Sequence, residues 1–194
     1  MEILKKSHFN MHLNCNELKE EILNDYQQEY ESIFREIKTT KIKKNSIDLL
    51  EFKKEISPTI YKRINSRGEP YYCINNFCGF NTKSLCEYSG KKLTDHEFDG
   101  NEIYICFGDS KDILAVLNVA LIAIECWKYI LNDKFHNENF DILMSLDEGK
   151  EFGVAPSATL RLYAIRDDYH FFAYDDIEEC KCSILIEQLH SSKR

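Results

Sequence analysis

The sequence predicts an α+β fold in which N-terminal helices pack on a mixed or antiparallel sheet around a long buried central helix. Three observations predict this class. Apolar residues recur at helical steps near the N-terminus, a nearly all-apolar helical pattern spans Ser110–Asn132, and short β-rich runs lie on both sides of that pattern. The 194 residues fit one domain, with a helical part over about 14–57 and an α/β part over about 58–194.

The first element is an amphipathic helix predicted from about Asn14 to Lys38, because apolar residues recur there at three- and four-residue steps. Asn14 and Glu17 can form a capping box at its start. A lysine-rich link follows, up to Lys44. A second, shorter helix is predicted to begin near Ser46 and to end before Pro58, since the residue before a proline avoids helical angles.

The middle of the chain predicts short strands and a long loop. Thr59–Ile64 and Pro70–Ile74 favour strands, separated by the turn-forming sequence Asn-Ser-Arg-Gly. Asn75–Asp99 shows no clear period and predicts a loop. Glu102–Phe107 is a further β-rich run, which the sequence Gly108-Asp109-Ser110 closes.

The central helix, over Ser110–Asn132, carries apolar residues around nearly its whole circumference, which indicates burial on most sides. Asn118 and Glu125 interrupt its apolar run. We therefore expect the uninterrupted run to be shorter than the ~18 residues that crossing a membrane needs.

After this helix, Phe140–Ser145, Ala158–Arg166 and Tyr169–Tyr174 predict strands. Asp167-Asp168 predicts a two-residue hairpin turn between the last two, although the usual glycine is absent. The periodicity of Asp176–Leu189 favours a helix, but its middle, Cys-Ser-Ile-Leu-Ile, also fits a strand.

Charge is distributed unevenly. Residues 1–70 carry 13 Lys and Arg against 12 Asp and Glu, whereas residues 71–194 carry 12 against 21, and the net charge is −8. An acidic body repels phosphate backbones, so direct nucleic-acid binding is disfavoured. It attracts a basic protein. The alternative interpretation is that the acidity only maintains solubility.

Cysteine content and the N-terminal sequence bear on the cellular compartment. No apolar run follows the first lysines, so we expect no secretory signal, a cytoplasmic location, and no membrane association. The eight cysteines should then remain thiols. Cys106 and Cys126 lie in apolar runs and are expected to be buried.

The usual motifs of metal, phosphate and catalytic chemistry are missing. Cys73, Cys78, Cys86 and His96 share one stretch, but the first pair is spaced too widely for a zinc knuckle and no second pair balances it. We therefore expect no metal and no cofactor. Gly90-Lys91 is not a phosphate loop, and no Gly-x-Ser-x-Gly occurs. Asp95-His96-Glu97 predicts a solvated turn with a histidine that tends to stay protonated.

Acidic residues interleaved with aromatic residues form the strongest remaining pattern. Charged rims with aromatic anchors are typical of tight protein interfaces. The alternative is a solvated hairpin whose aromatic side chains face the core. The predicted partner-binding residues are Asp167, Asp168, Tyr169, Tyr174, Asp175, Asp176, Glu178, Glu179, Asp95, Glu97, Asp99 and Glu102.

In overall character the chain resembles the bacterial immunity proteins that accompany polymorphic toxins of contact-dependent growth inhibition. The junction Phe107-Gly108-Asp109-Ser110 and the acidic hairpin Arg166–Glu179 carry this resemblance. It implies a non-enzymatic inhibitor that binds a cognate toxin domain, often a basic nuclease, and blocks its active site. Two alternatives remain open: a small cytoplasmic enzyme with an unrecognised Cys/His or carboxylate site, and an adaptor whose basic link near Lys38–Lys44 contacts something anionic.

Overall fold

The computed structural model describes residues 7–10, 51–74, 88–108, 113–149, 153–172 and 183–191. Within these ranges the protein has an α+β fold with three helices and two antiparallel sheets. In chain order the elements are β1 (Ser7–Asn10), α2 (Lys53–Ile56), β2 (Ile60–Ile64), β3 (Pro70–Ile74), α4 (Lys91–Gly100), β4 (Glu102–Cys106), α5 (Ile113–Lys134), β5 (Phe140–Asp147), β6 (Ser157–Ala164) and β7 (Ser183–Leu189).

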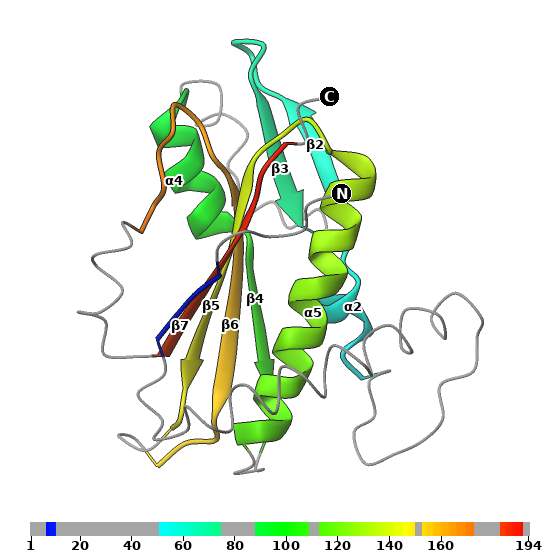
Figure 1. Ribbon diagram of the computed structural model, residues 1–194, viewed down its shortest axis with the longest axis vertical. Coiled ribbons are helices and arrows are strands. Elements are labelled where there is room, and N and C mark those ends of the chain that lie inside the picture. The colour runs from blue at the N-terminus through cyan, green and yellow to red at the C-terminus, as the bar shows by residue number, and fades with distance from the viewer. Residues whose placement is uncertain are drawn as a thin grey trace.

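The larger sheet has five strands in the order β1-β7-β5-β6-β4, and every neighbouring pair is antiparallel. β4 and β5 both pair with β6, so they run in the same direction with β6 between them. Helix α5 connects these two strands and crosses one face of the sheet (Figure 1). The sheet is therefore antiparallel, and the central helix lies on one of its faces rather than inside it.

Helix α5 and the sheet form the main core. Trp127 is completely buried, and its indole Nε1 donates a hydrogen bond to the carbonyl oxygen of Glu55 at 2.9 Å, which ties α2 to α5. By length and composition residues 115–134 could cross a membrane, with a mean hydropathy of 1.4, even though Asn118 and Glu125 interrupt the apolar run. However, 67% of that window is buried within the fold, as is typical of a core helix.

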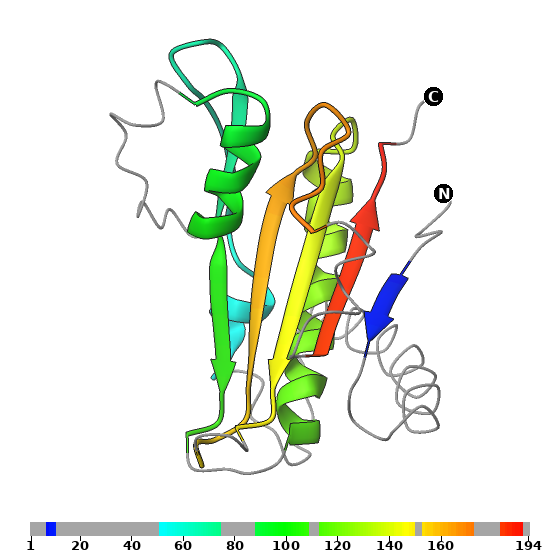
Figure 2. The same ribbon diagram turned by 90° about the vertical axis from the view of Figure 1, so that its left-hand side faces the viewer.

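The other face of the sheet is covered near one end by aromatic residues. Phe98 of α4 packs on Leu143, Tyr163, Ile184 and Ile186, together with Phe171 and Phe172 from the segment after β6. Figure 2 shows this segment crossing in front of the sheet, with α5 behind it. Further along the same face, Tyr104 of β4 is 58% exposed.

The smaller sheet is the β2–β3 hairpin, as predicted from Thr59–Ile64 and Pro70–Ile74. Its turn is closed by Asn65, whose side-chain oxygen accepts hydrogen bonds from the amides of Arg67 and Glu69, both at 2.9 Å. The ring of Tyr72 lies 5.2 Å from that of Phe135 and 4.7 Å from that of Phe140. The hairpin thus lies between α4 and the C-terminal end of α5 (Figure 1).

Several predictions need correction or fall outside the described residues. Residues 183–189 form a strand, not the end of a helix. This segment is an inner strand between β1 and β5, and its apolar residues are buried on both faces. A continuous apolar run fits such a position. The predicted helix Asn14–Lys38, the lysine-rich link, most of the helix predicted from Ser46, and residues 109–112 lie outside the described residues.

Candidate functional site

Helix α4 lies in the stretch that we expected to be a loop. Of its four buried residues, Leu93 and Phe98 are apolar, whereas Thr94 and Glu97 are polar. The segment therefore shows no continuous apolar stripe, and the hydrophobic period gave no signal. The buried polar residues belong there because they bind backbone groups of both sheets.

Glu97, one of the predicted partner-binding residues, is fully buried within this chain. Its Oε1 accepts a hydrogen bond from the amide of Tyr72 at 2.9 Å, and its Oε2 accepts one from the amide of Ala164 at 2.7 Å. Arg166 donates to the same two oxygens, at 2.5 Å and 3.0 Å. Burial raises the pKa of Glu97, while Arg166 and the two amides oppose that shift.

Asn101, one turn after Glu97, also links the end of α4 to both sheets. Its Nδ2 donates to the carbonyl oxygens of Tyr72 (2.9 Å) and Leu162 (3.0 Å), and its Oδ1 accepts from the amide of Ile74 at 3.0 Å. The pairing of β6 with β4 ends at Arg161. From that point the edge of β6 is bonded to side chains of α4 and Asn101. We call Thr94, Glu97, Asn101 and Arg166 the polar clamp.

A tight turn follows Arg166. Asp167 and Asp168 both have positive φ, 53° and 55°, and the amide of Tyr169 donates to the carbonyl oxygen of Arg166 at 2.9 Å. This confirms the predicted two-residue turn, since two successive left-handed residues make a type I′ turn. Pairing stops after one bridge, between Arg166 and Tyr169. The predicted strand Tyr169–Tyr174 is therefore wrong as far as Phe172, and the rest lies outside the described residues.

The turn brings two predicted acidic groups together. The hydroxyl of Tyr169 donates a hydrogen bond to Oδ1 of Asp95 at 2.8 Å, and this bond raises the pKa of Tyr169. Asp167 lies beside the start of α4, with its Oδ2 2.9 Å from where a side chain on Gly90 would begin. Asp167 and Asp168 are exposed. We call Asp95, Asp167, Asp168 and Tyr169 the acidic tip.

The acidic tip also has a positive neighbour. The Nζ of Lys91 lies 5.0 Å from the centre of the Tyr169 ring, a cation–π distance. Lys92 and Asp99 are exposed on the same helix. Together with Lys91, Lys92 and Asp99, the acidic tip presents four carboxylates and two ammonium groups, so this surface remains acidic.

The remaining predicted residues are dispersed or undescribed. Glu102 forms an ion pair with Arg161, whose guanidinium also donates to the carbonyl oxygen of Phe98 at 3.0 Å. Asp99 is exposed one turn beyond Asp95. Five predicted residues lie outside the described part of the chain: Tyr174, Asp175, Asp176, Glu178 and Glu179.

A histidine–aspartate pair was not predicted. His170 Nδ1 lies 2.6 Å from Oδ2 of Asp141, whose side chain is only 1% exposed, while 26% of the His170 side chain is exposed. Burial raises the pKa of Asp141, and hydrogen bonding and charge from His170 oppose the shift. A buried carboxylate that orients a partly exposed imidazole can fix the tautomer of the ring and hold a proton. The sequence does not mark Asp141 as special, because its strand also contains the polar residues Ser145 and Asp147.

The Asp95-His96-Glu97 prediction also needs correction. The three residues lie in helix α4 and not in a solvated turn. His96 is partly buried, with its ring 5.1 Å from that of Tyr88. Burial lowers the pKa of His96 although Asp99 opposes the shift, so the histidine has less tendency to be protonated than expected.

The described cysteines, Cys73, Cys106 and Cys126, are free thiols. Cys126 is buried as predicted, and burial raises its pKa to about 12. Cys106 is partly exposed, contrary to the prediction, because it lies at the end of edge strand β4. Among the described residues no three His, Cys, Asp or Glu side chains are grouped to hold a metal ion, and Cys78 and Cys86 lie outside those residues.

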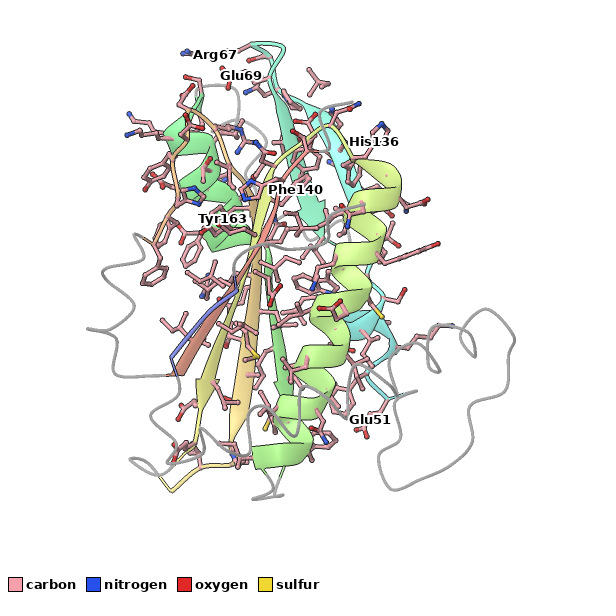
Figure 3. The ribbon with its side chains drawn as sticks, viewed as in Figure 1. Glu51, Arg67, Glu69, His136, Phe140 and Tyr163 are labelled. Atoms are coloured by element: carbon pink, nitrogen blue, oxygen red, sulfur yellow. The ribbon has the colours of Figure 1, made fainter. Side chains whose placement is uncertain are left out.

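No known protein family, curated protein or solved structure matches this chain. The geometry of this chain is therefore the guide to its function. That geometry offers two features at one end of the sheet: the acidic tip, held by the polar clamp, and the Asp141–His170 pair. Figure 3 shows Tyr163, which packs beside this pair, below α4 and on the side of the sheet away from α5.

Proposed function

We propose that the protein is an inhibitor of the immunity type, which binds a basic toxin domain through the acidic tip and blocks its active site. The hydrogen bond between Tyr169 and Asp95 carries the proposal, because it unites two acidic segments 74 residues apart into one surface. In this proposal the carboxylates bind lysine and arginine side chains that otherwise hold a phosphate backbone. The protein would act in the cytoplasm, as a stoichiometric partner without a cofactor.

Preorganisation supports this proposal. Arg166 donates hydrogen bonds to Glu97 and to the carbonyl oxygen of Pro70 at 2.9 Å, so the turn starts from a residue held by several hydrogen bonds. The left-handed conformations of Asp167 and Asp168 then fix the direction of their backbone. Binding groups that are already ordered lose less entropy on association. The net charge of −8 would also accelerate the encounter with a basic partner at low salt.

The first experiment is affinity capture from a lysate of the organism that makes the protein, at low and moderate salt. A stoichiometric basic partner should be captured, its toxicity should disappear when the two proteins are co-expressed, and the yield should fall at higher salt. A captured partner that is not toxic, or whose toxicity persists on co-expression, would contradict the proposal. A bait without any partner would favour the enzyme alternative, for which Asp141 and His170 are the first residues to test.

The surface is then tested with charge-matched variants. Asp167→Asn/Asp168→Asn removes two charges from the acidic tip, and asparagine tolerates the left-handed conformation, so the turn should persist. Glu51→Gln/Asp133→Asn removes two exposed charges elsewhere. The tip variant should weaken binding at least tenfold, with most of the change in the association rate and the salt dependence, while the control changes it less than twofold. Equal effects of the two variants would show that the tip contributes to binding only through the net charge of the protein.

A further inference from the structure

The segment 165–172, which we call the strap, leaves β6 and folds back over the sheet face opposite α5 (Figure 2). It begins at a hydrogen bond from the amide of Ile165 to the carbonyl oxygen of Asn139, at 2.9 Å. Near its other end, the ring of Phe171 stacks on that of Phe98, with 3.6 Å between the ring centroids and 10° between the ring planes. The strap contains Asp167, Asp168 and Tyr169, so its attachment determines where three of the four residues of the acidic tip lie.

Between these two points the strap is attached to the sheet by His170. Its Nδ1 lies 2.6 Å from Oδ2 of Asp141 and 3.3 Å from Nε2 of Gln188. Asp141 is on β5 and Gln188 is its register partner on β7, so both come from inner strands, near one end of the sheet. Among the described residues, Tyr163 on β6 and His190 just after β7 also act on Asp141.

We propose that the Asp141–His170 pair is a pH-sensitive clasp that holds the strap on the sheet and opens it as the imidazole loses its charge. The clasp is a property of this chain by itself. Opening the clasp would weaken the hold on the acidic tip, and the consequence for partner binding rests on the proposed function.

The direction of the effect follows from burial. A carboxylate that is 1% exposed is stable as an anion only with a positive or hydrogen-bonding partner beside it. Histidines change charge between about pH 5 and pH 8, and a charge-assisted hydrogen bond is roughly twice as strong as a neutral one. Acidic conditions within this range therefore favour the closed strap. Without that charge the buried carboxylate would keep only weaker partners, and opening the strap would let water reach Asp141.

Amide hydrogen exchange on the isolated protein tests the clasp without a partner. The protection factor, which is corrected for the intrinsic pH dependence of exchange, is measured for a peptide covering residues 166–172 between pH 5.5 and pH 8.0. We expect protection of this peptide to fall about three- to tenfold across that range, whereas a peptide from the middle of α5 keeps its protection. Protection of the strap that does not change with pH would overturn the proposal.

Three variants identify the titrating pair. Asp141→Asn and His170→Gln should each abolish the pH dependence of strap protection, and His170 is partly exposed, so its variant does not depend on filling a core position. His190→Gln is the matched control, because it removes an imidazole that acts on Asp141 only through charge. It should keep most of the pH dependence. Loss of the dependence in His190→Gln, or its persistence in His170→Gln, would overturn the clasp. Because no partner is present, these results stand apart from the capture experiment.

Discussion

Arg166 donates hydrogen bonds to both carboxylate oxygens of Glu97, and the side chains of the two residues are 13% and 0% exposed. The pair joins helix α4 to the chain at the point where β6 ends and the acidic tip begins. Each oxygen of Glu97 also accepts a hydrogen bond from a backbone amide, one from each sheet. One buried carboxylate thus connects the hairpin, the main sheet and the turn.

Removing one member of this pair should destabilise the protein strongly, because the other charge stays buried. Glu97→Gln or Arg166→Met should each lower the free energy of unfolding by about 3–5 kcal/mol, and the double variant by less than the sum. Urea unfolding of the four proteins measures the coupling. Lys62→Met, which breaks the exposed pair with Glu138 (2.7 Å), serves as the control and should cost under about 1 kcal/mol. Additive effects at Glu97 and Arg166 would show that the pair is not coupled.

Asn101 should matter through the backbone groups that it satisfies. Asn101→Ala leaves two carbonyl groups and one amide without their partner in the interior, and should lower the free energy of unfolding by about 3 kcal/mol. Asn132→Ala, at an exposed position of α5, is the control and should change stability by less than about 0.5 kcal/mol. Similar losses in both variants would refute the bridging role, and thermal unfolding followed by circular dichroism suffices to compare them.

Stability should depend on pH through His96. Burial lowers the pKa of His96 in the folded protein, so the unfolded chain binds a proton more tightly. The contribution of this residue to stability is therefore present above its ordinary pKa of 6.5 and is lost as the pH falls below that value. His96→Gln should remove this part of the pH dependence, so the stability difference between wild type and variant should shrink from pH 7.5 to pH 5. A difference that stays constant would contradict the assignment. Urea unfolding at each pH measures it.

Substitutions at two glycines near one loop can distinguish steric contact from backbone strain. Gly149 and Gly153 both have positive φ, 69° and 63°, so alanine is strained at either position. A Cβ at Gly149 would lie 2.2 Å from the carbonyl oxygen of Val154, whereas nothing lies within 4 Å of one at Gly153. Gly153→Ala should cost about 1 kcal/mol. Gly149→Ala should cost at least about 2 kcal/mol more, and equal melting temperatures of the two variants would show that the loop relaxes freely.

Local sequence patterns predicted the strands, the buried helix and the turn, whose formation depends mainly on neighbouring residues. The bounds of Pro70–Ile74 are those predicted, and Glu102–Phe107 is one residue longer than the strand observed, because β-rich runs bounded by turn residues are informative by themselves. The apolar circumference of the central helix likewise indicated its burial. The turn at Asp167-Asp168 was also predictable, because aspartate tolerates the left-handed conformation.

The site depended on contacts that the sequence does not display. Glu97 has the same appearance in the sequence as an exposed acid, and only its four hydrogen-bond donors, from Tyr72, Ala164 and Arg166, explain its burial. His170 and Asp141 are 29 residues apart and meet because the strap folds back over the sheet. Neither segment has a local signal for that meeting. The acidic tip was only half predictable: the residues were identified, but not the hydrogen bond that unites them.

The order of the strands also has a consequence for how the protein is made. Strand β1, at residues 7–10, pairs with β7, at residues 183–189, so the first described strand pairs with the last one. During synthesis on the ribosome, the edge formed by β1 cannot close until residue 189 has emerged from the exit tunnel. Until then β5 also lacks β7 and exposes a free strand edge. Nascent chains of this protein should therefore need the protection of chaperones until β7 is available for pairing.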